Sequence, residues 1–420
     1  MVEMKFNAGD YVKLRLAKRE IEGTVLESQD GSVLLLKLSS GYNIGILREN
    51  VLGWRVLRKF KEEEGDFELP KGEKGLPSIG LIVTGGTIAS KLDAKTGGVA
   101  PLTHLGEFAK FYPELFKMAN VKIIDSPFMI ASESMSVEHW RKIADSTRRM
   151  LNDSSISGVV ITHGTDTLHY TSAALSFFLK DLNKPVVLTY SQRSVDRASS
   201  DASLNLQCAV LMALSNCAEV VLVGHGTTND DFCYAFRGTK VRKMHTSRRD
   251  TFKAVNDLPL ARVTPDKVEF LEERRPRSKS EVILDYEFSD KVALVKFYPG
   301  QSADILDYYA LKYRGVVLEG TGLGHVSEEW TMRLKKVIRE GLVVCMTSQC
   351  LFGRVDGFVY SNGRALIDAG VVFLEDVLPE TALVKLGWIL GHHGWKGKVK
   401  EKMLENVAGE LNPKLGLGFL

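Results

Sequence analysis

Two glycine-containing segments carry hydroxyl and carboxylate side chains that could take part in chemistry. The first is Thr84 to Thr87 (TGGT), and the second is Thr162 to Thr167 (THGTDT). A threonine hydroxyl on a tight glycine turn and a nearby carboxylate are groups that can contact a bound ligand. Each segment alone is also compatible with a structural role, because threonine and aspartate often cap helices.

Both segments follow apolar runs that read as strands, at residues 79–83 and 158–162. Further strands are expected at 121–124, 185–189 and 219–223, with helices at 168–182 and 201–214. This strand-helix alternation predicts a parallel, doubly wound sheet. Ligands of such sheets bind at the carboxyl ends of the strands, so the two segments are expected to face one pocket.

The rest of the chain predicts an α/β protein in which a small N-terminal β-barrel precedes two α/β domains. Residues 1–60 contain five short strands, at 11–16, 23–26, 33–38, 43–47 and 53–57, typical of a small barrel domain. Residues 61–77 are charged and rich in proline and glycine, which indicates a linker. Residues 78–280 form the first α/β domain, and residues 281–420 form a smaller one with strands at 292–297, 315–318 and 343–347.

Composition excludes several classes of protein. The 420 residues carry 55 lysines and arginines against 52 acidic residues, and this net charge of +3 does not by itself indicate a polyanionic partner. Five cysteines without C-x-x-C spacing indicate a reducing compartment, so the chain is expected to be cytoplasmic. Charges or glycines interrupt every hydrophobic run, which argues against a signal peptide or membrane span.

Three smaller segments have both a structural and a functional interpretation. Gly238 to Asn256 is strongly basic and contains Lys243, which reads either as a surface lysine in a solvated loop or as a functional group. His392 and His393 predict a helix-end turn and no metal site, because no carboxylate or cysteine follows at ligand spacing. Arg274 to Arg277 and Lys279 read as a solvated linker, with contact to tRNA phosphate as the alternative.

Together, T-G-G-T-I and T-H-G-T-D-T resemble the two ordered signatures of the type I asparaginase family, from Ser78 onward. The resemblance implies that Thr87 is the nucleophile and that the other catalytic residues are Thr165, Asp166 and Lys243. It assigns substrate binding to Ser132, Gly86, Gly164 and Asp166, with Ser134 as an alternative to Ser132 for the α-carboxylate. Asp166 would hold the α-ammonium group.

The sequence departs from that family in two places. The family places a tyrosine on a mobile loop after the nucleophile, whereas Ser90 to Pro101 has no aromatic residue. The N-terminal barrel is also an addition. A barrel, a linker and an asparaginase-like region are similar to the family of D subunits of archaeal glutamyl-tRNA(Gln) amidotransferases, as are Gly9 to Val12 and Lys243 to Asn256.

That second resemblance implies a glutaminase that supplies ammonia for converting Glu-tRNA(Gln) to Gln-tRNA(Gln). The expected partner is the E subunit of the amidotransferase, around a homodimer core within a heterotetramer that binds the tRNA. The chain has no G-x-x-x-x-G-K-[ST] phosphate loop, and Glu319 to Val326 is a lone glycine-rich turn. ATP and Mg are therefore expected on the partner, with no cofactor or metal in this chain.

Two other functions remain open from the sequence. One is a free type I L-asparaginase with an added barrel. The other is a catalytically silent scaffold that only holds a partner or tRNA, against which the intact Thr87, Thr165, Asp166 and Lys243 argue.

Overall fold

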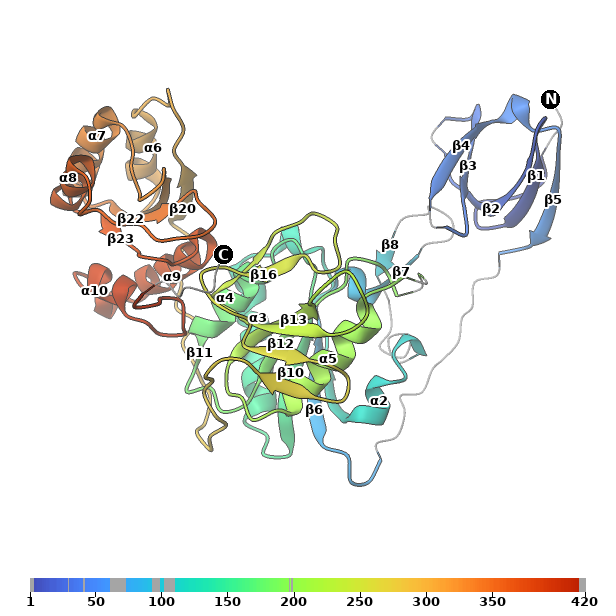
Figure 1. Ribbon diagram of the computed structural model, residues 1–420, viewed down its shortest axis with the longest axis horizontal. Coiled ribbons are helices and arrows are strands. Elements are labelled where there is room, and N and C mark those ends of the chain that lie inside the picture. The colour runs from blue at the N-terminus through green and yellow to red at the C-terminus, as the bar shows by residue number, and fades with distance from the viewer. Residues whose placement is uncertain are drawn as a thin grey trace.

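Three sheets carry the architecture, and Figure 1 shows them in chain order from blue to red. The computed structural model describes residues 4–28, 30–40, 42–60, 73–92, 99–101, 110–195, 197 and 199–414. Most of the predicted linker, at residues 61–72, lies outside the described residues. Below, the main-sheet domain means residues 78–270 and the C-terminal domain means residues 292–404.

The N-terminal sheet is antiparallel throughout, in the order β4-β3-β2-β1-β5. Its strands are β1 Tyr11–Arg15, β2 Glu20–Leu26, β3 Val33–Lys37, β4 Asn43–Leu47 and β5 Gly53–Arg58, with the 3-10 turn η1 Arg48–Asn50 before β5. Alternate residues such as Val12, Leu14, Leu34 and Leu36 are buried, because successive side chains of a strand point to opposite faces. The five predicted strands are confirmed, and the sheet curls into a barrel-like shape (Figure 1).

The large sheet has the order β18-β17-β14-β13-β12-β10-β6-β9. Its five parallel strands are β9 Asn120–Asp125, β6 Ser78–Val83, β10 Ile156–Thr162, β12 Val186–Thr189 and β13 Val220–His225. Three antiparallel strands that the sequence did not reveal extend it: β14 Cys233–Arg237, β17 Ala261–Val263 and β18 Val268–Phe270. The predicted parallel sheet is therefore confirmed over five strands and continues as a mixed sheet.

Helices cover this sheet and exclude water from its strands. The longer ones are α3 Val137–Leu151, α4 Leu168–Phe178 and α5 Ala202–Leu214. The predicted helix 168–182 ends early because the chain turns into β11 Leu179–Lys180, which pairs with β19 Ile283–Leu284. The remaining short elements are η2 Thr87–Ala89, β7 Ser90–Leu92, β8 Val99–Pro101, α2 Leu115–Met118, η3 Ser132–Ser134, β15 Val241–Lys243 and β16 Phe252–Ala254.

The C-terminal domain contains a parallel sheet in the order β20-β21-β22-β23. Its strands are β20 Val292–Lys296, β21 Gly315–Gly320, β22 Val343–Ser348 and β23 Val372–Phe373. Its helices are α6 Ile305–Lys312, α7 Glu328–Arg339, α8 Ser361–Ala369, α9 Pro379–Gly391 and α10 Val399–Leu404, with the 3-10 turn η4 His393–Trp395 before α10. The glycine-rich turn after β21 closes through a bridge between Thr321 and His325, as a strand-to-loop turn does.

The two α/β domains share a packed boundary. Helix α9 packs against α4, and the rings of Phe177 and Trp388 stack with centroids 5.5 Å apart. The sequence predicts a second, solvated linker at Arg274 to Arg277 and Lys279. That prediction is wrong at Arg277, whose guanidinium donates to the backbone carbonyls of Ser215 and Ala213. Of the helices in the described residues, none combines the length and apolar character that crossing a membrane requires.

Candidate active site

The first predicted segment forms a tight loop at the carboxyl end of β6. Thr84 is buried and donates its backbone N–H and its hydroxyl to the carbonyl of Thr162, which joins β6 to β10. Gly85 and Gly86 have φ values of +111° and +79°, a backbone conformation that residues other than glycine rarely adopt. The chain then enters η2 at Thr87, which is partly exposed. The turn thus places Thr87 at the carboxyl end of β6.

Two further hydrogen bonds hold the backbone of this turn. The Ser90 hydroxyl donates to the Gly86 carbonyl at 2.8 Å, and the buried Tyr112 hydroxyl donates to the Ile88 carbonyl at 2.6 Å. Tyr112 was missed in the sequence, because nothing in its local pattern connects it to a turn 24 residues earlier. The part of Ser90 to Pro101 at residues 93–98 lies outside the described residues.

The second segment forms the neighbouring loop, at the carboxyl end of β10. An added Cβ on Gly86 would lie 2.4 Å from the Gly164 nitrogen, so the two loops touch through their glycines. An added Cβ on Gly164 would lie 2.9 Å from the Ser132 hydroxyl oxygen. The structure therefore brings Gly86, Gly164 and Ser132 together, with Thr87 and Thr165 each one residue from the contact.

Ser132 and its alternative Ser134 differ in position. Ser132 is 3% exposed, and its carbonyl accepts a hydrogen bond of 2.7 Å from the Thr167 hydroxyl, whereas Ser134 faces solvent. The geometry therefore favours Ser132 as the residue beside the two loops.

Lys243 completes a polar cluster with the second segment. Its Nζ donates to the Thr165 hydroxyl at 2.8 Å and to Asp166 Oδ1 at 2.6 Å. The Lys243 side chain is 12% exposed, whereas the Asp166 side chain is 62% exposed. A largely buried ammonium group thus touches one hydroxyl and one carboxylate, while the exposed carboxylate of Asp166 stays accessible to a ligand.

This lysine lies on the hairpin of β15 and β16, where Lys243 pairs with Phe252. The basic segment around it is therefore an ordered hairpin and not a solvated loop. The hairpin was missed because each strand has only three residues and lacks a clear alternation of apolar side chains.

His163, inside the second signature, supports the loop from within the core. Its Nδ1 lies 2.7 Å from the Gly164 carbonyl oxygen and its Nε2 lies 2.8 Å from the Thr171 hydroxyl, which also accepts from Trp140. Burial lowers the pKa of His163 to about 4, so the ring is neutral at neutral pH. A neutral ring donates through one nitrogen and accepts through the other, which matches both contacts.

His169 lies buried near Lys243. Burial, together with the charges of Arg242 and Lys243, lowers its pKa to about 3. The His169 ring is therefore neutral at neutral pH.

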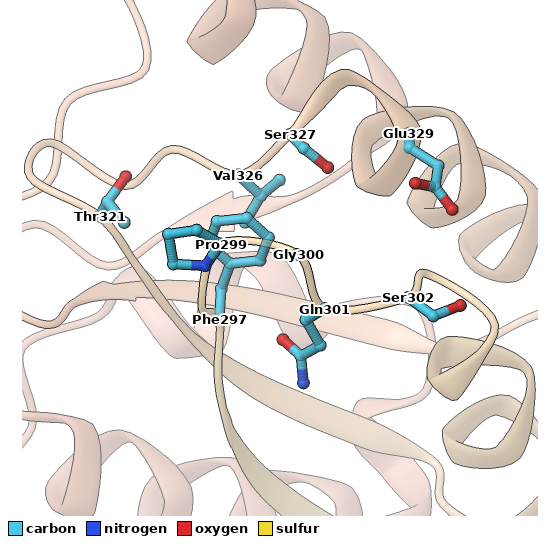
Figure 2. A pocket seen from close by; sticks show the side chains of 9 residues that line it. All are labelled: Phe297, Pro299, Gly300, Gln301, Ser302, Thr321, Val326, Ser327 and Glu329. Atoms are coloured by element: carbon cyan, nitrogen blue, oxygen red, sulfur yellow. The ribbon is translucent and has the colours of Figure 1, made fainter.

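A hollow of about 720 Å³ lies elsewhere, at the carboxyl ends of β20 and β21 (Figure 2). Its lining includes Phe297, Gln301, Thr321 and Glu329, and none of the candidate catalytic or substrate-binding residues.

No group of three metal-ligating side chains occurs in the described part of the chain. His392 instead contacts Trp388 and Asp285 at the end of α9, as a helix-end turn predicts.

Comparisons with known proteins agree with this arrangement. Family models match "Asparaginase, N-terminal" at residues 78–276, "Glutaminase/Asparaginase C-terminal domain" at 291–403 and "GatD N-terminal domain" at 6–57. Among solved structures, the thermostable L-asparaginase from Thermococcus kodakarensis superposes with a TM-score of 0.73 and 30% identity. The alignment covers the full length of that asparaginase and 80% of this chain. L-asparaginase I from Vibrio cholerae gives 0.70 and 29% over the same shares.

The similarity to curated relatives runs over nearly the full chain. The D subunit of glutamyl-tRNA(Gln) amidotransferase from Thermococcus kodakarensis is 50% identical over 96% of this chain and 94% of its own length. The corresponding proteins of Pyrococcus furiosus and Sulfolobus acidocaldarius are 50% and 44% identical, over 96% and 97% of this chain and 95% and 92% of their own lengths. With its barrel-like N-terminal sheet, its asparaginase-type domains and these relatives, the chain belongs to the family of glutamyl-tRNA(Gln) amidotransferase D subunits.

Proposed function

We propose that this chain is the glutaminase component of a tRNA-dependent amidotransferase and that Thr87 is its nucleophile. The observation that carries the proposal is the Lys243–Thr165–Asp166 cluster, on a loop that touches the glycine turn of Thr87. The 50% identity to named D subunits supports glutamine hydrolysis within a multi-subunit enzyme. The L-asparaginase neighbours match only 80% of the chain, so the free-asparaginase alternative has weaker support.

The proposed chemistry divides a difficult hydrolysis into two steps. Thr87 Oγ1 attacks the side-chain amide carbon of glutamine and loses its proton, and the amide nitrogen gains a proton and leaves as ammonia. The product is a glutamyl ester on Thr87. Water then adds to that ester, the bond to Oγ1 breaks, the hydroxyl regains its proton and glutamate departs. Backbone N–H groups of the glycine turn would stabilise the negatively charged oxygen formed in each step.

Substrate orientation falls to the residues around the two loops. The exposed carboxylate of Asp166 would hold the α-ammonium group of glutamine, and Ser132 would bind the α-carboxylate. Lys243 contacts the Thr165 hydroxyl, which places a proton-carrying group within reach of the reacting atoms. Two roles are open to this lysine, a fixed positive charge and a base.

The proposal extends to the assembly. As a D subunit, the chain works with a partner, which we propose to be the E subunit of the amidotransferase, around a homodimer of this chain in a cytoplasmic heterotetramer. Use of ATP and Mg, and contact with Glu-tRNA(Gln), belong in this proposal to that partner and the assembled complex. The L-asparaginase alternative predicts instead a chain that acts alone on asparagine.

Replacing glutamine with ammonium tests the division of labour. The complex of Thr87→Ala chain with its partner should make no Gln-tRNA from glutamine, yet should match the wild-type complex when ammonium is supplied, since only ammonia production is lost. Gln-tRNA formation from Glu-tRNA(Gln) is measured for both complexes with each nitrogen source. A complex that binds tRNA normally but gains nothing from ammonium would contradict the proposal, as would a lone wild-type chain that prefers asparagine.

Gly86→Ala should reduce glutamine hydrolysis by about 100-fold, because its Cβ would meet the Gly164 backbone at 2.4 Å and push the two loops apart. Gly397→Ala is the matched control, since Gly397 has a similar φ of +86° but no atom within 4 Å of an added Cβ. That control should lose only about 1–2 kcal/mol of stability. Ammonia release and urea unfolding are measured for both variants. Equal activities would show that the loop contact does not matter for catalysis.

A further inference from the structure

We infer that the buried ion pair of Lys240 and Asp376 positions Lys243, so that the C-terminal domain holds part of the active site of the main-sheet domain. Lys240 and Asp376 act here as positioning residues and do not touch the substrate. The inference rests on the proposed catalytic role of Lys243 and adds the structural device that sets its place.

The alternation of a short strand explains how one segment serves two domains. β15 consists of Val241–Lys243, and Lys240 directly precedes it. Since successive side chains of an extended strand point to opposite sides, Lys240 and Arg242 share one side while Lys243 lies on the other. Lys240 and Arg242 both reach the C-terminal domain, whereas Lys243 reaches Thr165 and Asp166.

The contacts on the C-terminal side are direct. Lys240 Nζ lies 2.7 Å from Asp376 Oδ2 and also donates to the Asp376 carbonyl at 3.2 Å, with both side chains 0% exposed. Arg242 forms an ion pair of 3.0 Å with Glu380 in the first turn of α9. Two charged side chains on either side of Val241 are therefore anchored to the segment that begins α9.

Asp376 is itself held in place by several partners. Its Oδ1 accepts from the Asn412 backbone N–H, and its Oδ2 accepts from the Asn412 side-chain amide, each at 2.9 Å. Asn256, two residues beyond β16, donates to the Asp376 carbonyl at 3.3 Å. Both ends of the hairpin thus meet at Asp376, which fixes the hairpin from its entry and its exit.

The Lys240–Asp376 pair contributes more to the position of the hairpin than to the stability of the fold. Removing two charges from water is costly, and well-packed apolar residues often stabilise a core as well as a buried ion pair does. An ion pair is directional, however, and at full burial no water can replace a lost partner. Lys243 is only three residues further along, and a shift of about 1 Å at a reacting group can cost about 100-fold in rate.

Glu410 provides a matched control. Its carboxylate lies 2.6 Å from Lys385 Nζ, and both side chains are 0% exposed, as in the Lys240–Asp376 pair. Glu410 otherwise accepts from the backbone of Val407 and Ala408. Its charge also acts on Lys240, but more weakly than that of Asp376, and within the described residues it makes no hydrogen bond to the hairpin. Asp376→Asn and Glu410→Gln therefore remove the same charge from two equally buried pairs.

The experiment measures glutamine hydrolysis by the full chain with its partner, well below the melting temperature of every variant. Asp376→Asn should lower kcat about 10-fold or more while KM changes less than about threefold, whereas Glu410→Gln should keep kcat within about twofold. A merely structural role would lower the melting temperatures of both variants without this selective loss of kcat. Equal kcat losses, or an unchanged kcat in folded Asp376→Asn, would overturn the inference.

Two further variants keep the test decisive. The double variant Lys240→Met with Asp376→Leu removes both charges and keeps an apolar core, so it should fold yet still lose kcat; wild-type kcat here would also overturn the inference. Lys243→Met separates the two levels of argument. If Lys243→Met is fully active, the proposed role of Lys243 fails, whereas an inactive Lys243→Met beside a fully active Asp376→Asn rejects the positioning role alone.

Discussion

Thr87→Ala is expected to lower glutamine hydrolysis by at least about 1000-fold, which corresponds to about 4 kcal/mol of lost transition-state stabilisation. The substitution removes the hydroxyl that would form the covalent ester. The neighbouring hydroxyls of Thr84 and Ser90 both donate to backbone carbonyls and so hold the turn together. The methyl group that remains should preserve the turn, because Tyr112 and Ser90 hold its backbone. Ammonia release is measured with the partner present.

Thr87→Ser is the matched control for this prediction. Serine keeps the hydroxyl and loses only a methyl group, so it should retain a measurable part of the activity, while both variants should unfold at nearly the same urea concentration. If Thr87→Ala kept more than about a tenth of the wild-type rate, another nucleophile would have to be sought. If Thr87→Ser were as inactive as Thr87→Ala, the exact placement of the oxygen would matter more than its presence.

The sequence was sufficient where the physical signal is local. Strands such as β10, buried on both faces, appear as continuous apolar runs, and β1 of the N-terminal sheet alternates buried apolar residues with more exposed ones. The glycine turn could be located because only glycine adopts the positive φ of Gly85 and Gly86 at little cost. These features depend on residues a few positions apart, so one sequence reveals them.

The sequence was insufficient where distant segments meet. Lys243 and Asp166 are 77 positions apart, and Lys240 and Asp376 are 136 positions apart, so no local pattern reports either pair. The resemblance to asparaginases supplied Lys243, but nothing supplied Asp376 or Tyr112. The early end of α4 has the same origin, because Leu179 joins a strand pair with Leu284, over a hundred residues later. Tertiary pairing there overrides the helical pattern of the sequence.

Lys243→Met is expected to reduce kcat for glutamine hydrolysis by about 100- to 10,000-fold, the range typical of a positioned acid or base. The variant removes the donor to the Thr165 hydroxyl and the partner of Asp166, while methionine keeps most of the volume of the 12% exposed side chain. Lys253→Met is the matched control, because Lys253 lies on the same hairpin but pairs with Asp250 instead. It should keep kcat within about threefold.

Lys243→Arg then separates the two roles open to this lysine. Arginine retains the positive charge and can pair with Asp166, but it does not release a proton at any pH at which the protein is folded. If Lys243 serves as a fixed charge that orients Thr165 and Asp166, the arginine variant should recover much of the activity lost in Lys243→Met. If Lys243 must move a proton, or if the 2.8 and 2.6 Å contacts need its compact ammonium group, arginine should be nearly as inactive as methionine. Steady-state ammonia release is measured for the two variants and the Lys253→Met control. Recovery in Lys243→Arg would show that a fixed positive charge is sufficient, whereas wild-type activity in Lys243→Met would exclude both roles.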